Sequence, residues 1–437
     1  MLRIVPGTLP TPSDLRQCAL CQGQAAESDT PSDGRAPLAR AAAGYWDGPE
    51  RVWTSYRTDL GSEMRWGRTA VLATATAVGA GAAALFAGRV VSDFSVRPRG
   101  AAPAAAGGLR VHSLAAGRVE LTRSWETQRP GRYALEWNEG RAVVGEVVGT
   151  TAQTVVRRLE STGTDGGSPL AVGTTVRITP QVLTGDPRSA VGLEYSEIHV
   201  RGELGPMPAW YLAGVRDLCV IAVHGIGADR RQALPLLPLL DRLKVPVLVV
   251  TYRNDEGAPR SPDGIAHFGE TEWRDVEAAI RLAVDGGARR ILLYGWSAGA
   301  TMALQAAARS DHREAVRGLV LDSPVLDWQD TVRRQATRRG VPGPLAELGV
   351  RAAQGRSAVD PAGFDRLALG ADLTVPALLL HSADDTVAAV EAARALARRR
   401  EDLVVYEEYA GAEHEALWNA DPERYEAILL KFLTPLL

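Results

Sequence analysis

The sequence predicts an α/β protein with a doubly wound, mostly parallel, eight-stranded sheet and a short helical cap, preceded by a small β-rich module and a transmembrane or signal helix. From about residue 190, apolar runs of strand length alternate with helical segments. This pattern is typical of strands that are buried on both faces beneath covering helices. Between residues 110 and 189 the runs are shorter, β-branched or alternating, and turn-forming segments such as NEG (138–140) separate them. This pattern of short runs and turns indicates a distinct β-rich module.

A chain of 437 residues is long enough for more than one structural unit. We expect five segments: a disordered extension (1–63), a transmembrane or signal-anchor helix (64–91), a linker (92–109), the β-rich module (110–189) and an α/β domain (190–437).

Composition and cysteine content exclude several classes of function. The chain is 46% hydrophobic and 23% charged with a net charge of −3, so it offers no general attraction for nucleic acid. Cys18 and Cys21 form a C-x-x-C pair without a second pair, and a zinc site needs more ligands. Cys219 lies in an apolar run and is expected to be buried. We therefore expect no metal, no organic cofactor and no nucleic-acid partner.

An uncharged run lies between Arg68 and Arg89. A helix of this length spans about 30 Å, the thickness of a membrane core. Met64 and the basic residues after it precede the run as in a signal peptide or signal anchor, so residues 1–63 are interpreted as an upstream extension. Basic residues on the two sides are nearly balanced, but no small-x-small cleavage site follows the run. We expect residues 69–91 to anchor the protein in a membrane, with the α/β domain on the extracytoplasmic side.

Two local patterns define elements of the α/β domain. The runs EIHVRGE and PAWYLAG are joined only by LGPM (204–207), which is too short for a crossover, so they should form an antiparallel hairpin at the sheet edge. Residues 270–287 carry Trp273, Val276 and Ile280 at helical spacing and should form an amphipathic helix.

Polar side chains follow the expected strands at the points where those strands end. These residues are His224 with Gly225, then Ser297, then Asp322, then Asp384 with Asp385, while His414 lies beyond the last strand. Because functional residues of a doubly wound sheet gather at the carboxyl ends of its strands, these positions are the candidates for a site.

Ser297 stands in GWSAG, between an expected strand (291–295) and an expected helix (298–309). This context is the one that a nucleophile elbow requires, and the small residues Gly295 and Gly299 allow the strand and helix to pack closely. The helix start favours a developing negative charge. The amide of Ala298 is therefore a candidate oxyanion donor.

A serine at neutral pH needs a proton acceptor, and histidine is the most suitable side chain. His414 is the histidine beyond the final strand, in a loop that precedes a helix. His224 and His381 stand at strand ends in structural turns. His267 is expected at the surface of a polar loop, with contact to a substrate as the alternative.

An acid must hold the imidazole in one tautomer. Asp384 and Asp385 are adjacent, so only one of them faces the site, and Asp322 is a further candidate with an alternative role as a loop cap. The order Ser, Asp, His along the chain matches one arrangement of hydrolytic triads.

The stretch from about residue 190 to 437 resembles the α/β-hydrolase superfamily, in its peptidase- and esterase-like branch. The matching segments are HGIG (224–227), GWSAG (295–299), LLLHSADDTVAA (378–389) and GAEHEALW (411–418). The resemblance implies that Asp385, four residues after His381, is the acid, and that the amides of Ile226 and Ala298 form the oxyanion hole. Ser382 and Ala389 depart from the family's usual Gly and Pro without touching the acid.

The resemblance implies a serine hydrolase that cleaves an ester, amide or thioester of a small-molecule or peptide acyl substrate through an acyl-enzyme. The alternative is a membrane-anchored, non-catalytic binding protein of the same fold. Helical segments within 331–340 and 344–355 would form the short cap. Trp296 and Trp328 are candidates either for pocket walls or for packing.

Overall fold

The computed structural model describes residues 108–437 except 139, 165–167 and 358. The expected extension, the anchor (69–91) and the Cys18–Cys21 pair lie outside these residues. Within residues 108–437, those gaps apart, no helix is long and apolar enough to cross a membrane.

Residues 109–179 form a small barrel, the expected β-rich module. Six antiparallel strands close in the order β1-β2-β5-β4-β3-β6. The strands are β1 (Leu109–Ala115), β2 (Arg118–Thr122), β3 (Tyr133–Trp137), β4 (Gly140–Thr150), β5 (Thr154–Thr164) and β6 (Thr175–Thr179), with the short helix α2 (Trp125–Gln128) between β2 and β3. Inward side chains alternate with outward ones: Val119 and Leu121 of β2 are fully buried, whereas Arg118 is exposed. The alternation explains why the sequence shows period-two patterning here.

Arg157 of β5 occupies the barrel interior with no exposed surface. Its guanidinium donates to the backbone carbonyls of Gly145 (2.8 Å), Thr127 (3.0 Å), Arg129 (2.8 Å) and Gly131 (2.6 Å). Burial lowers the pKa of Arg157 to about 10, so the side chain stays charged at neutral pH. Three of the four carbonyls belong to residues 127–131, and this buried cation therefore fixes that loop.

The α/β domain is built on an eight-stranded sheet in the order β14-β13-β12-β11-β9-β10-β8-β7. The strands are β7 (Ser196–Gly202), β8 (Gly205–Leu212), β9 (Leu218–Val223), β10 (Val247–Val250), β11 (Arg290–Trp296), β12 (Val316–Asp322), β13 (Ala377–Ser382) and β14 (Val404–Tyr409). Strands β9 to β14 pair in parallel, β8 is antiparallel to β10, and β7 pairs antiparallel with β8. The expected edge hairpin is confirmed.

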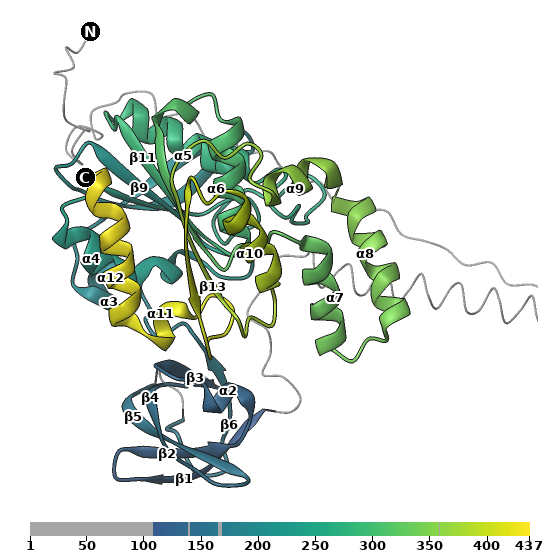
Figure 1. Ribbon diagram of the computed structural model, residues 1–437. Helices are drawn as coiled ribbons and strands as arrows, with labels where there is room; N and C mark the ends of the chain where they lie inside the picture. Colours follow the sequence, from purple (N-terminus) through teal and green to yellow (C-terminus); the bar gives the residue numbers. More distant parts are fainter. Residues whose placement is uncertain (1–107, 139, 165–167, 358) are drawn as a thin grey trace, which may run out of the picture. The chain divides into compact units, whose positions relative to one another are not determined.

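Helices cover both faces of this sheet (Figure 1). One face packs against α5 (Trp273–Asp285), α6 (Ala298–Arg309) and α10 (Val390–Arg399). The other packs against α4 (Leu237–Arg242), α11 (Leu417–Ala420) and α12 (Pro422–Leu433), and α3 (Pro187–Val191) lies on the same side. The central strands β9, β11 and β13 are buried along their lengths apart from the intermediate Arg290, as their near-continuous apolar sequences predict.

The expected cap consists of three helices between β12 and β13. They are α7 (Trp328–Arg338), α8 (Gly343–Ser357) and α9 (Pro361–Ala368). Their apolar faces form a separate core with Ile265 and Phe268 of the loop before α5. Leu367 of α9 belongs instead to the main core, so the cap has its own cluster and is joined to the main domain through α9.

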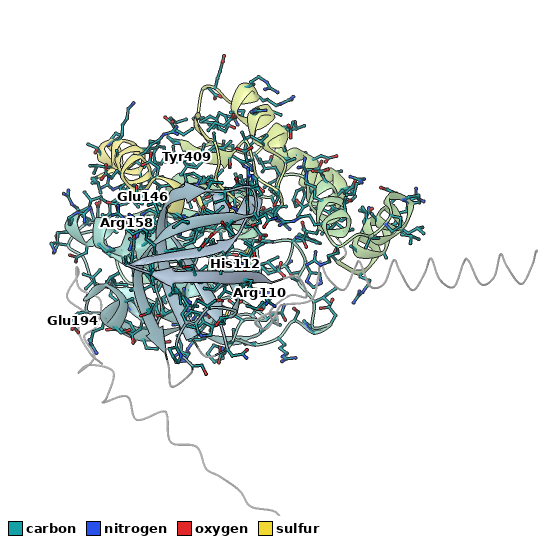
Figure 2. The ribbon with its side chains drawn as sticks, turned by 90° about the horizontal axis from the view of Figure 1, so that it is seen from below. Arg110, His112, Glu146, Arg158, Glu194 and Tyr409 are labelled. Atoms are coloured by element: carbon teal, nitrogen blue, oxygen red, sulfur yellow. The ribbon has the colours of Figure 1, made fainter. Side chains whose placement is uncertain are left out.

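Replacing Arg157 by Met leaves four buried carbonyls without their donor, so we expect the free energy of unfolding to fall by roughly 2–4 kcal/mol. Urea denaturation followed by circular dichroism measures the change. Arg158→Met is the matched control, because Arg158 is 60% exposed and pairs with Glu146 on the outside of the barrel (Figure 2). The control should change the free energy by less than about 0.5 kcal/mol. Equal losses in the two variants would contradict the role assigned to Arg157.

Candidate active site

Ser297 stands on a strained turn between β11 and α6. Its φ of 52° and ψ of −120° lie outside the ordinary regions for a residue with a side chain. A Cβ added at Gly299 would overlap the carbonyl oxygen of Val223, and one at Gly295 would overlap the backbone of Ala300. Both glycines therefore allow the close strand–helix contact that the turn needs. The hydroxyl of Ser297 makes no capping bond to α6.

A continuous line of hydrogen bonds joins the three side chains singled out in the sequence. The Nε2 atom of His414 lies 2.8 Å from Oγ of Ser297, and its Nδ1 lies 2.7 Å from Oδ2 of Asp385. Ser297 is 8% exposed and Asp385 is 6% exposed. The structure thus brings together a hydroxyl, an imidazole and a carboxylate at a nearly enclosed site.

Asp385 is held on every side by donors. Its Oδ1 accepts the amides of Val387 (2.7 Å) and Ala388 (2.8 Å), and Oδ2 also lies 3.3 Å from Nε2 of His381. Burial alone would raise the pKa of Asp385, but the charge on His414 and the hydrogen bonds from His381 and His414 lower it well below the usual range. The carboxylate is therefore ionised at any working pH.

The pKa of His414 moves in the opposite direction. Burial alone would lower it, but the charge of Asp385 and the hydrogen bond to it raise the pKa above the usual value, with smaller effects of the same sign from Glu415 and Glu413. The imidazolium is thus stabilised next to Ser297, which suits a group that must accept a proton from the hydroxyl.

Asp384 and Asp322 lie near the site without touching His414. Oδ2 of Asp384 accepts the amide of Gly411 at 2.6 Å. Asp322 accepts the hydroxyls of Tyr425 (2.6 Å) and Ser323 (2.8 Å). Burial raises the pKa of Asp322 to about 6 against those hydrogen bonds. Both carboxyls have structural partners, so the geometry selects Asp385.

The two amides that the sequence suggested as oxyanion donors are at the neighbouring strand ends. Ile226 follows β9 and Ala298 begins α6. Neither amide donates to a protein acceptor within the part of the chain that the structure describes. Just before Ile226, the ring of His224 bonds the carbonyl of Gly225 and the carboxylate of Asp255, both at 2.9 Å. This buried ring fixes the loop that carries the Ile226 amide.

The remaining predicted side chains have packing or structural roles. Trp296 and Trp328 are 4% and 2% exposed and belong to separate apolar clusters. Cys219 is buried, as expected. The surface placement of His267 is wrong: the residue is 8% exposed, and its Nε2 lies 2.9 Å from Asp263. Among the described residues, no group of His, Cys, Asp or Glu side chains is arranged so that it could hold a metal ion.

Sequence reasoning missed several residues that support the site. Glu413 accepts the amide of His414 at 3.1 Å, and Arg129 of the barrel donates to Glu413 at 2.8 Å. Glu415 has a positive φ of 58°, and its amide donates to Ser323. The acidic run around His414 was visible in GAEHEALW, but its partners come from distant parts of the chain.

Two parts of the sequence match models of known protein families. Residues 220–428 match the sequence model described as the alpha/beta hydrolase family. The C-terminal domain has the α/β-hydrolase fold. Residues 110–179, most of the barrel, match a model described only as a domain of unknown function. No curated protein matches the sequence.

Solved structures similar to the α/β domain share little sequence with it. An esterase of Pyrococcus furiosus is 19% identical with a TM-score of 0.49, and the match covers 58% of this chain and 95% of that chain. An α/β serine hydrolase without lid from Xanthomonas campestris is 16% identical with a TM-score of 0.40, over 56% of this chain and 95% of the other. A putative α/β hydrolase from Agrobacterium tumefaciens is 15% identical with a TM-score of 0.41, over 55% and 97%.

Asp385→Asn removes the acceptor that fixes the tautomer of His414, so we expect kcat on a hydrolysable ester to fall by roughly three to four orders of magnitude. Asp384→Asn is the matched control, since the carboxylate of Asp384 accepts the amide of Gly411 and makes no hydrogen bond to His414 within the described part of the chain. The kcat of Asp384→Asn should stay within roughly tenfold of the wild-type value. A steady-state assay of both variants measures the difference. A larger loss in Asp322→Asn than in Asp385→Asn would overturn the assignment.

Proposed function

We propose that the protein is a serine hydrolase that cleaves an ester, amide or thioester bond of a small-molecule or peptide acyl substrate. The observation that carries the proposal is the hydrogen-bonded line from Ser297 through His414 to Asp385, built on a strained strand-to-helix turn. A buried hydroxyl and imidazole 2.8 Å apart have the geometry of a nucleophile and its base.

In the first half of the reaction, Oγ of Ser297 attacks the substrate carbonyl and its proton passes to Nε2 of His414. Asp385 stabilises the resulting imidazolium through Nδ1 and does not itself become protonated. The C–O or C–N or C–S bond to the leaving group then breaks, and the leaving group takes the proton from His414. The product of this half is an acyl ester of Ser297.

In the second half, water attacks the acyl ester, and His414 accepts a proton from that water. The bond to Oγ of Ser297 breaks, the hydroxyl recovers the proton, and the carboxylic acid leaves. The negative oxygen of each tetrahedral intermediate accepts hydrogen bonds from the amides of Ile226 and Ala298. Removal of one such donor in other hydrolases typically lowers kcat by roughly 100- to 1,000-fold.

A fluorophosphonate probe tests the proposal directly. It should label the wild type covalently, and Ser297→Ala should abolish labelling, because the probe reacts with an activated serine. Ser310→Ala, at the other end of α6, is the matched control and should label normally. Gel fluorescence and mass spectrometry of the labelled peptide measure the result. A folded wild type that remains unlabelled would favour the alternative, a non-catalytic binding protein.

We also propose that residues 69–91 anchor the protein in a membrane, with the hydrolase domain on the extracytoplasmic side. The uncharged run from 69 to 88 supports this placement. After an alkaline carbonate wash, the full chain should stay with the membrane fraction, and a chain lacking residues 69–91 should be released. Protease added outside intact cells should degrade the hydrolase domain. Recovery of the full chain in the soluble fraction would contradict the anchor.

A further inference from the structure

The loop at residues 129–132 of the barrel contacts both the loop that carries His414 and the helix α11 that follows it. The amide of Arg132 donates to the carbonyl of Asn419 at 3.0 Å, and the side-chain amide of Asn419 returns a bond to the carbonyl of Arg132 at 2.8 Å. Gly131 fits so closely that a Cβ there would overlap the carbonyl oxygen of Asn419. Ala416 is fully buried in the apolar core of the barrel itself. The segment just after His414 is thus held on the barrel.

A buried ion pair holds the segment just before His414. Arg129 is 6% exposed, stacks on the ring of Trp125 at 4.3 Å, and donates to Oε2 of Glu413 at 2.8 Å. The barrel also fixes the backbone from which Arg129 projects, because the buried Arg157 donates to the carbonyl of Arg129. The cation is therefore presented to Glu413 from a rigid support.

Glu413 connects this support to both partners of the proposed triad. Its Oε1 accepts the amide of His414 at 3.1 Å, and it also accepts the hydroxyl of Thr386 at 2.6 Å and the amide of Thr386 at 3.3 Å. Thr386 directly follows Asp385. One carboxylate, neutralised by Arg129, thus joins the loop of the base to the loop of the acid.

We propose that the barrel is a working part of the active site: Arg129, acting through Glu413, is a positioning residue for His414 and Asp385. This inference rests on the proposed hydrolase function and gives the barrel a role in it. The barrel bonds to residues that come before and after His414 in the sequence: the side chain of Glu413, and the backbone and side chain of Asn419. A shift of this loop by about 1 Å would lengthen the bond from His414 to Ser297, and such misplacement costs up to roughly 100-fold in rate.

Because the groups in this arrangement are charged, they affect the pH dependence of kcat/KM, which a purely packing role would leave unchanged. The carboxylates that act on His414 are those of Asp385, Glu413, Glu415 and Asp322, and the basic side chains near them are those of Arg129, Arg334, Arg338 and His381. Glu413 raises the pKa of His414, and Arg129 offsets part of that charge. The base works only when deprotonated, so the acid limb of the kcat/KM profile follows this pKa.

The test compares purified full-length variants on a neutral chromogenic ester across pH. Arg129→Met should lower kcat roughly 10- to 100-fold with little change in KM, and should move the acid limb upward by about 0.5 pH unit, because Glu413 loses its counter-charge. Glu413→Gln should move the limb downward, since the charge itself is removed. Arg129→Lys should restore most of the rate and the wild-type limb. The matched control Arg158→Met, an exposed barrel arginine, should resemble the wild type.

The contrary results are equally definite. The proposal would be overturned if the acid limb of the kcat/KM profile of Arg129→Met stayed at the wild-type pH. It would also be overturned if Arg129→Met lost no more kcat than Arg158→Met. Should Arg129→Met fail to fold, the downward shift in Glu413→Gln supports the proposal and an unshifted limb overturns it. Ser297→Ala distinguishes a failure of the proposed hydrolase function from a failure of the positioning role of Arg129. If the wild type shows no turnover abolished by Ser297→Ala, the proposed function fails, and NMR titration of the His414 ring in the same variants still reads the shift.

Discussion

The strained backbone of Ser297 is the constraint on which the rest of the site depends. A residue with a side chain reaches a φ of 52° and a ψ of −120° only when its surroundings hold it there. The amide of Ser297 donates to the carbonyl of Asp322 on the neighbouring strand at 2.8 Å, and the helix after it packs against the end of β9. Gly295 and Gly299 are the positions where this packing leaves no room for a Cβ. The turn directs the hydroxyl away from the helix and toward His414.

The sheet order then decides which loops meet the serine. The chain leaves β9 toward β10 on one side and returns to β11 on the other, so the carboxyl ends of β9 and β11 lie side by side at a switch point. This arrangement puts Ile226 and Ala298 at the ends of neighbouring strands. Strands β12 and β13 follow in order beyond β11, and the loops after β13 and β14 supply Asp385 and His414. Ser297, Asp385 and His414 come in this order along the chain because they follow β11, β13 and β14.

These features explain what the sequence could predict. Ser297 and His414 occupy positions whose local context is informative: a strand before a glycine-flanked serine, and a histidine after the last strand. The choice of Asp385 over Asp384 required the family resemblance, because two adjacent carboxylates look alike in sequence; in the structure they differ in that one accepts two amides of its own turn and faces His414. The burial of His267 could not be predicted, because a polar loop gives no sign that Glu272 and Asp263 lie on either side of the ring.

The contact between Arg129 and Glu413 could not be predicted, for a different reason. The two residues are 284 positions apart, and although Glu413 stands beside His414 in GAEHEALW, nothing in that segment indicates a partner in the barrel. Arg157 shows why the contact is more than incidental packing. A fully buried cation is costly unless hydrogen bonds compensate it, and all the hydrogen bonds of the Arg157 guanidinium go to backbone carbonyls. What it fixes is the loop that presents Arg129, Gly131 and Arg132 to the segment around His414. The four hydrogen bonds offset part of the cost of burying Arg157, and the same bonds hold the barrel loop that meets residues 413–419 of the α/β domain.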